Sequence, residues 1–298
     1  MAKRGEIRIG ISGWRYAPWR GVFYPEGLRQ KDELSFASRR FRSIEINGTF
    51  YGPQRPPVFG RWAAETPEDF VFAVKAPRYI THIRRLRDPE EPLANFLASG
   101  LLKLGTKLGP ILWQFPPSFR YDRALIEPFL ALLPHDTEAA GRCAARHDAR
   151  MKEVVLTPDA RRPMRHAIEI RHESFVDPDF IDLLRAHQVA LVCADTVEWP
   201  RLMDLAADFV YCRLHGSEQL YASGYDDKAL DDWARWIDAW ARGGEPHGTG
   251  IRRISDRAGP PQAARDVYVY FDNDMKVRAP FDADGLAARL GVARAEAA

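Results

Sequence analysis

Cysteine is scarce in this sequence, and the few cysteines form no recognisable motif. The 298 residues contain three, Cys143, Cys193 and Cys212, and no C-x-x-C pair. Cys193 and Cys212 fall in segments that we expect to be strands, where a reduced, buried thiol is the simplest interpretation. We therefore assign these two cysteines no chemistry beyond packing.

Long apolar runs and a strong net charge are also missing. No apolar stretch approaches ~18 residues, so we expect no transmembrane helix. Met1 to Gly5 lead into a segment that carries Glu6 and Arg8, which argues against a signal peptide. The formal net charge of +2 is too small to indicate nucleic acid or a membrane surface by itself. These absences predict a cytoplasmic protein with no membrane partner.

Motifs for nucleotides and metals are absent as well. No G-x-G-x-x-G or G-x-x-x-x-G-K-[ST] follows any expected strand, which weakens the case for a nucleotide-binding sheet. No H-E-x-x-H and no tight His/Cys cluster occurs. Carboxylates and histidines from different strands could still bind a divalent metal, but we do not favour this alternative. We assign no metal ligand, and the sequence names no cofactor.

What the chain does contain is a regular series of short apolar segments, mostly separated by segments with helical spacing. They lie at 7–13, 43–47, 70–75, 111–115, 166–171, 189–194, 209–215 and 267–271. This alternation predicts a parallel α/β fold, and a count of eight favours a closed TIM (β/α)8 barrel over an open sheet. We predict a single domain over residues 1–298, with surface excursions near 134–165 and 243–266.

Polar residues end several of these expected strands. Glu169 and Arg171 stand two residues apart, so their side chains leave the same face of one strand. Glu45 and Asn47 repeat the arrangement, and His215 ends a third strand. Because the active site of a TIM barrel lies at the carboxyl ends of the strands, we expect one shared polar mouth.

Several motifs along the chain resemble the YecE-like family, labelled domain of unknown function 72 (DUF72). They include Gly10-Ile11-Ser12-Gly13-Trp14, Glu45-Ile46-Asn47, Glu169-Ile170-Arg171-His172, Arg213-Leu214-His215-Gly216 and Tyr268-Val269-Tyr270-Phe271-Asp272-Asn273. The resemblance covers nearly the whole chain and implies a TIM-barrel-like fold with a polar pocket, but no particular activity. The family commonly carries Asn-Asn and Asn-Ala where this chain reads Asp272-Asn273 and Asp282-Ala283. Two acids in place of amides add negative charge, which bears on ligand or metal preference.

We assign two roles to the residues of the expected mouth. The candidates for acid–base catalysis are Glu169, Asp195, His215 and Asp272. The candidates for substrate binding are cations, amides and rings: Trp14, Asn47, Tyr51, Lys75, Gln114, Arg171, His172, Arg213, Tyr221 and Asn273.

A purely structural interpretation competes with catalysis for the deeper acids. Glu45 and Glu169 could form an internal ion-pair lattice with the cations and simply hold the barrel's register. We expect Arg171 to have a carboxylate partner, either Glu169 or a barrel neighbour such as Glu45 or Asp195, because an unpaired guanidinium inside a barrel is too costly. Lys75 as a Schiff-base nucleophile would need a lowered pKa, and nearby acids would instead hold it charged, so we favour an anion-binding or structural lysine.

Two further groups of residues have competing interpretations. The aromatic loop from Trp14 to Tyr24 is either a hydrophobic plug over the core or a platform for substrate. His82, His135, His147, His187 and His247 fall in helices or loops, and we interpret them as surface residues.

Together these features predict an enzyme that acts on a polar, anionic or phosphate-bearing small molecule at the barrel mouth. A hydrolase- or lyase-type reaction with acid–base or metal-assisted chemistry would suit the side chains. The alternative is a nucleic-acid-binding barrel, with metal-dependent phosphodiester chemistry or none, or a non-catalytic ligand-binding protein. Salt dependence separates nucleic-acid binding from the binding of a small molecule, because binding that involves many phosphates weakens steeply with salt.

Overall fold

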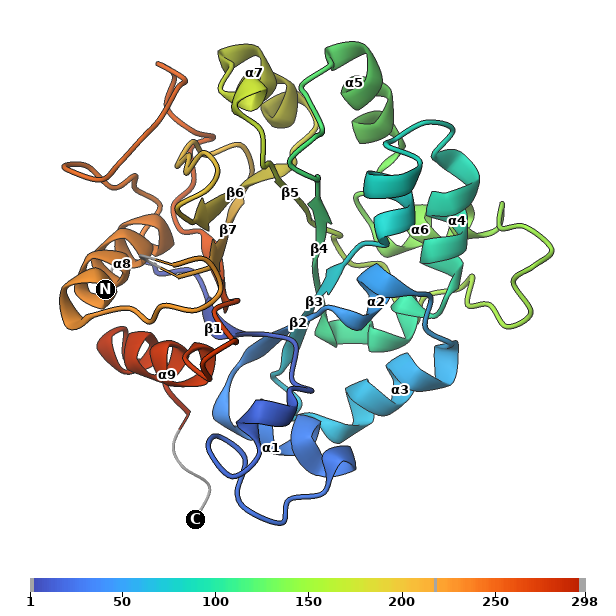
Figure 1. Ribbon diagram of the computed structural model, residues 1–298. Helices are drawn as coiled ribbons and strands as arrows, with labels where there is room; N and C mark the ends of the chain where they lie inside the picture. Colours follow the sequence, from blue (N-terminus) through green and yellow to red (C-terminus); the bar gives the residue numbers. More distant parts are fainter. Residues whose placement is uncertain (1–2, 217–218, 295–298) are drawn as a thin grey trace.

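Eight parallel strands close into a barrel in chain order, from β1 round to β8 (Figure 1). The computed structural model describes residues 3–216 and 219–294. The strands are β1 Ile7–Ser12, β2 Ser43–Ile46, β3 Val71–Lys75, β4 Leu108–Gln114, β5 His166–Glu169, β6 Ala190–Asp195, β7 Phe209–Leu214 and β8 Asp266–Phe271. The TIM-barrel fold predicted from the eight apolar segments is therefore confirmed.

Helices surround this barrel on the outside, as Figure 1 shows from a view into its opening. They are α1 Glu33–Arg40, α2 Gly48–Tyr51, α3 Pro56–Glu65, α4 Glu90–Ala98, α5 Arg123–Leu132, α6 Thr137–Ala144, α7 Pro178–Ala186, α8 Asp227–Ala241 and α9 Ala279–Arg289. The connection from β6 to β7, residues 196–208, is fully described and contains no helix. No described helix is long and apolar enough to cross a membrane.

Side chains alternate between the inside of the barrel and the helical layer outside it. On β6, Val192 and Ala194 belong to the inner cluster, whereas Leu191 and Cys193 belong to the outer core. Tyr211 packs in the barrel interior, with its ring centroid 5.1 Å from that of its neighbour on β8. The same alternation aims the polar residues at several strand ends inward, among them Glu45, Glu169 and Arg213, whereas Asp195 at the end of β6 points outward.

The outer core explains the tryptophan-rich helix. Trp233, Trp236 and Trp240 of α8 stand at i, i+3 and i+7 and expose 1%, 7% and 0% of their surface, so they form a packing face of the helix. The helix begins after Asp226, whose side chain accepts a hydrogen bond from the backbone N–H of Ala229.

Glycine and proline mark the ends of several helices. Gly100 has φ +115° and ends α4 before a short helix at Leu101–Lys107. The last helix begins at Ala279, with a proline in its first turn.

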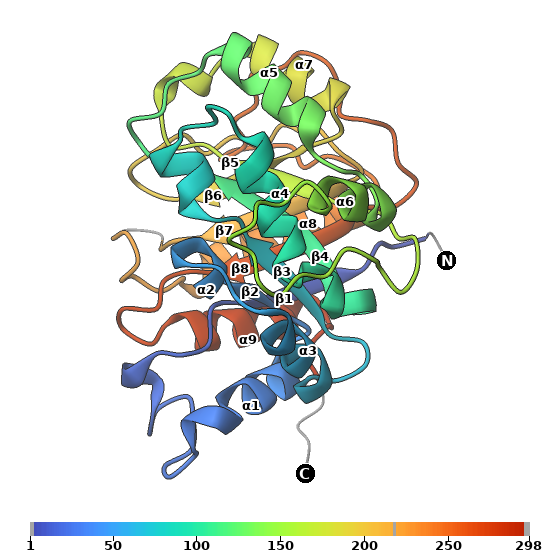
Figure 2. The same ribbon diagram turned by 90° about the vertical axis from the view of Figure 1, so that its right-hand side faces the viewer.

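Figure 2 views the barrel from the side, with the N-terminus at the right, where β1 begins. The loops that follow the strands lie at the left, and the carboxyl ends of all eight strands face that way. The excursion at 134–165 contains α6 and is closed by a bridge between Asp136 and Pro163. The excursion at 243–266 is irregular and is tied down by Arg265, whose Nη1 donates to the carbonyl of Gly243 at 2.6 Å.

Candidate functional site

The guanidinium of Arg213 lies at the centre of the barrel mouth and contacts three carboxylates. Its Nη1 lies 2.6 Å from Glu169 on β5, and its Nη2 lies 2.9 Å from Glu45 on β2 and 2.9 Å from Asp272 just past β8. The side chains of Arg213, Glu45 and Glu169 are fully buried. One cation therefore joins three separate strand ends.

Glu45 has no spare acceptor capacity in this arrangement. Its Oε1 accepts from Arg213 and from the hydroxyl of Ser12, and its Oε2 accepts from the hydroxyl of Tyr211 at 2.6 Å. The amide of Asn47 donates to Ser12 Oγ at 2.9 Å. This is the geometry of the ion-pair lattice that we considered for the deep acids. Because both of its oxygens are engaged, Glu45 is better suited to a structural role than to proton transfer.

Arg171 has the carboxylate partner that we predicted. Its Nη2 lies 2.6 Å from Glu169 Oε1, and its Cζ lies 4.1 Å from the centroid of the Trp199 ring. Burial alone would raise the pKa of Glu169, but Arg171 and Arg213 hold it well below its usual range. Glu169 is therefore ionised at any physiological pH.

Lys75 differs from both arginines, because it has no carboxylate of its own. It ends β3, exposes 8% of its surface, and makes no ion pair or side-chain hydrogen bond with any described residue. Its Nζ lies 4.3 Å from the centroid of the Phe50 ring. Burial and the neighbouring Arg213 lower the pKa of Lys75 to about 8. The acids that we expected to hold Lys75 charged bind the two arginines instead, although the ammonium still predominates at pH 7.

His215 is wholly buried beside the acids. Its Nδ1 lies 3.1 Å from Asp272 Oδ2 and its Nε2 lies 3.8 Å from Glu169 Oε1, yet within the described chain neither nitrogen has an aligned hydrogen-bond partner. Burial lowers the pKa of His215, so the ring is neutral at pH 7. Tyr221 covers it edge-on at 5.4 Å, from a backbone position with φ +59°.

The pKa values of two acids at the end of β8 are shifted in opposite directions. Burial would raise the pKa of Asp272, but Arg213 and His215 hold it well below its usual range. Burial and the negative charge of Asp272 raise the pKa of Asp274 to about 6. Such a pair, with one acid ionised and the other near neutrality, is typical of sites that transfer protons.

His82 lies at the mouth, close to Lys75, rather than on the open surface as we had interpreted it. Its Nε2 lies 3.4 Å from the amide nitrogen of Gln114, and its ring lies 5.0 Å from Phe50. Burial, Lys75 and Arg78 lower the pKa of His82 to about 4. The ring is therefore neutral at physiological pH and can act as a hydrogen-bonding wall.

A cavity of about 310 Å³ adjoins the mouth on the side of β1 and β2. Its lining includes Trp14, Tyr16, Asn47, Tyr51 and Trp62. Trp14 and Tyr16 line this space, whereas the rest of the loop plugs the core, as one of the two interpretations of the aromatic loop predicted. The plugging residues are Trp19, Phe23 and Tyr24, which expose 0%, 9% and 1%.

Three predicted site residues lie apart from this cluster. Asp195 points into the outer layer, where its carboxylate accepts from Arg201 at 2.7 Å and from Trp233 of α8 at 3.3 Å. His172 Nδ1 accepts from the backbone N–H of Ser174 at 3.0 Å and so caps a short turn.

The third, Asn273, is also engaged by the protein. Its Nδ2 donates to Asp282 Oδ2 at 2.7 Å and to the carbonyl of Ser223 at 2.9 Å, and it exposes no surface. The departure to aspartate at position 282 thus gives the Asn273 amide a carboxylate acceptor. The two residues hold the loop after β7 against the end of β8.

Most residues of the cluster were predicted from the sequence, but some were not. Glu169, His215, Asp272, Lys75, Gln114, Arg171, Arg213, Asn47 and Tyr221 do converge. The sequence did not predict Ser12, Trp199, Tyr211 and Asp274 as members. The inward alternation along β1 and β7 could have indicated Ser12 and Tyr211, whereas Asp274 and Trp199 stand in loops without any periodic pattern.

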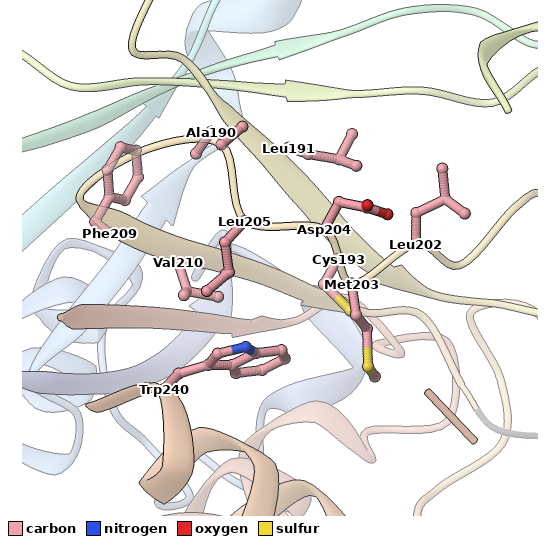
Figure 3. A pocket seen from close by; sticks show the side chains of 11 residues that line it. Ala190, Leu191, Cys193, Leu202, Met203, Asp204, Leu205, Phe209, Val210 and Trp240 are labelled. Atoms are coloured by element: carbon pink, nitrogen blue, oxygen red, sulfur yellow. The ribbon is translucent and has the colours of Figure 1, made fainter. Parts of the chain in front are cut away.

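Other cavities and clusters add nothing to this site. A space of about 10 Å³, shown in Figure 3, lies between β6, β7 and Trp240 and is lined mainly by apolar side chains such as Leu191 and Leu205. It has room for about one water molecule. Among residues 3–216 and 219–294, no group of three or more His, Cys, Asp or Glu side chains is arranged to hold a metal ion.

Comparison with known proteins agrees with the fold and the motifs. A sequence model of the family described as "Protein of unknown function DUF72" matches residues 8–298. The chain is 30% identical over 113 residues to the UPF0759 protein YecE of Escherichia coli K12, which covers 38% of this chain and 39% of YecE. It is 35% identical over 118 residues to the UPF0759 protein YunF of Bacillus subtilis 168, with 38% and 41% covered. The matched segment thus spans about two fifths of either curated relative.

Solved structures give a match over nearly the full length. A DUF72 family protein from Thermotoga maritima MSB8 superposes with a TM-score of 0.71 and 24% identity, over 96% of this chain and 99% of the other. A DUF72 family protein from Enterococcus faecalis V583 gives a TM-score of 0.67 and 17% identity, over 98% and 99%. At these identities the structures support the fold alone.

Proposed function

The chain belongs to the family of proteins of unknown function DUF72, and we propose that it is an enzyme that turns over a small anionic molecule in the barrel mouth. The family and its fold leave the activity open. The proposal rests on the side chains of the mouth.

The main support for the proposal is that the ammonium of Lys75 is buried and has no carboxylate partner among the described residues. Glu45, Glu169 and Asp272 each contact an arginine in the same mouth. A buried cation that the protein leaves unpaired is stabilised when an anion binds beside it. A carboxylate or phosphate group on a substrate would meet that need.

Further polar groups beside Lys75 suit recognition of such an anion. Arg171 still exposes 11% of its side chain although it pairs with Glu169. Gln114 and His82 supply neutral hydrogen-bonding groups next to each other, 3.4 Å apart. A phosphate or carboxylate could therefore accept bonds from side chains of three neighbouring strand ends and loops.

Asp272 and Asp274 are the proposed acid–base pair. Asp272 stays ionised because Arg213 contacts it, and it can stabilise positive charge or accept a hydrogen bond from substrate. Asp274, with its pKa raised to about 6, can give and take a proton near neutral pH. His215 and Arg213 position Asp272 rather than react, since both side chains are wholly buried.

The test is anion binding measured by thermal shift. Inorganic phosphate and small carboxylates should raise the melting temperature of the wild type and leave that of Lys75→Met unchanged. Lys152→Met, which changes an exposed lysine of the 134–165 excursion, is the matched control and should respond like the wild type. Equal shifts in both variants would contradict the assignment of Lys75.

Turnover is tested separately with a panel of phosphate esters and keto acids. Any activity should fall at least tenfold in Asp274→Asn, because one side chain transferring a proton typically contributes roughly 10²–10⁴-fold. If the variant retains full activity on every substrate that the wild type consumes, Asp274 is not the acid–base residue.

A nucleic-acid strand is the second candidate ligand. Two rings that follow β2 and β3, Tyr51 at the end of α2 and Tyr79 at the start of a short helix, are 75% and 48% exposed. The exposed Arg78 stands beside Tyr79. Rings with cations are the usual platform for single strands. Oligonucleotide binding that weakens steeply between about 50 and 200 mM salt, with no turnover of small molecules, would favour this candidate.

A further inference from the structure

We infer that the 310 Å³ cavity beside the mouth is a subsite for a flat heteroaromatic ring, so that the substrate is a nucleotide-like molecule with a ring at one end and an anion at the other. The inference rests on the proposed function, since it takes Lys75 as the site of the anion. It adds the chemical class of the remainder of the substrate.

The walls of the cavity are aromatic, and one of them is open. Trp14 exposes only 6% and is fixed edge-on against Trp62 at 5.3 Å between ring centroids. Tyr51 exposes 75%, which is unusual for so large a ring, while it also lines the cavity. Rigid aromatic faces with one accessible ring offer stacking to a planar ligand.

Polar atoms on the cavity wall have unused capacity. Asn47 Nδ2 donates to Ser12, but its buried Oδ1 has no hydrogen-bond partner within the described residues. The side-chain amide of Gln54 also lines the space. An unpaired buried acceptor costs stability until a donor reaches it. The ring N–H or amino group of a nucleobase is such a donor, whereas an all-carbon ring is not.

Two direct contacts connect the cavity with the anion site. Lys75 Nζ lies 4.3 Å from the Phe50 ring, and that ring lies 5.1 Å from the Tyr51 ring. Asn47 reaches the lattice through Ser12, which also accepts from Arg213 at 3.1 Å. The cavity and the anion site are therefore neighbours in the mouth, and we take one molecule to span both. The cavity volume is at the lower end of the range for small-molecule sites, roughly 300–1,000 Å³.

The experiment is isothermal titration of the full chain with adenosine 5′-monophosphate, ribose 5-phosphate, inorganic phosphate and adenosine. The nucleotide should bind about tenfold or more tightly than ribose 5-phosphate, which is the gain expected for one stacked base. Tyr51→Ala should remove most of that gain and leave the binding of ribose 5-phosphate unchanged. Tyr79→Ala, which removes another exposed ring outside the cavity lining, should change neither affinity.

The outcomes separate this inference from the function on which it rests. Equal affinities for the nucleotide and ribose 5-phosphate, together with loss of both in Lys75→Met, would overturn the ring subsite and support the anion site. Adenosine binding that depends on Tyr51, without any response to phosphate, would support the subsite and overturn the anion site. Absence of binding by all four compounds would overturn both.

Discussion

Lys75 is protonated at neutral pH although its buried position disfavours the charged form. Burial and Arg213 lower its pKa from 10.5 to about 8. A lowered pKa means that the folded state releases the proton more easily than the unfolded chain does. The cost to stability is therefore full below pH 8 and disappears as pH rises from 8 towards 10.5.

This cost predicts that Lys75→Met is more stable than the wild type. The gain at pH 7 should be up to roughly 3 kcal/mol, at ~1.4 kcal/mol for each pKa unit, and should shrink steadily above pH 8. Urea unfolding at pH 7 and pH 10 measures both values. Lys152→Met should show no such trend, and a Lys75→Met variant that is less stable than wild type at pH 7 would contradict the burial argument.

Residue types and their spacing predicted most members of the polar cluster but not their partners. The sequence indicates that Glu169 and Arg171 share one face, and they do form an ion pair. It contains no sign that Arg213 contacts three acids and leaves Lys75 without one, because that depends on distances across the barrel. Asp274 was missed because its raised pKa comes from burial in the folded protein and from the charge of Asp272.

At the scale of the element, the positions of the strands could be predicted from the sequence. Which face of each strand points into the barrel could be predicted only in part. The expected strands match the observed ones within a few residues because each is a short apolar run bounded by breakers. Asp195 was expected in the mouth because it ends β6, yet it faces α8. The strand reads Ala-Leu-Val-Cys-Ala-Asp, and a strand buried on both faces shows no polar alternation from which its inward side could be read.

The end of α4 depends on a single glycine, Gly100, which provides a prediction. It has φ +115°, and a Cβ there would lie 2.5 Å from the Cα of Pro56 on α3. Gly100→Ala should therefore destabilise the protein by about 1–3 kcal/mol, through backbone strain together with the clash. Thermal or urea unfolding of the purified variant measures the loss.

Gly60 is the matched control, because it lies inside α3 and a Cβ added there would meet no atom within 4 Å. Gly60→Ala should stabilise by up to about 1 kcal/mol, as alanine favours the helix. If both substitutions have the same sign, the local geometry of Gly100 is not what ends α4.

At the scale of the whole molecule, the mouth joins parts of the chain that are distant in sequence. Arg213 contacts residues 201, 168, 44 and 59 positions away, namely Ser12, Glu45, Glu169 and Asp272. Its removal would leave three carboxylates close together with their main counter-charge gone. Such a change affects the closure of the barrel and not one strand alone.

Arg213→Met should therefore cost about 3–5 kcal/mol, the usual loss when one partner of a buried ion pair is removed. The denaturation midpoint in urea measures it. Arg257→Met, which breaks an exposed pair with Asp182 at 3.3 Å, should cost less than about 1 kcal/mol. A loss for Arg213→Met as small as the control would show that the lattice does not hold the barrel together.

The position of Arg213 late in the chain also determines when its ion pairs can form during synthesis. During synthesis Glu45 and Glu169 emerge long before position 213, and until then the cation that neutralises both is absent. Until then Arg171 can pair with Glu169, but Glu45 lacks the arginine that it contacts in the folded protein and must stay hydrated. Closure of the barrel depends on contacts of long sequence separation, so we expect it to be slow.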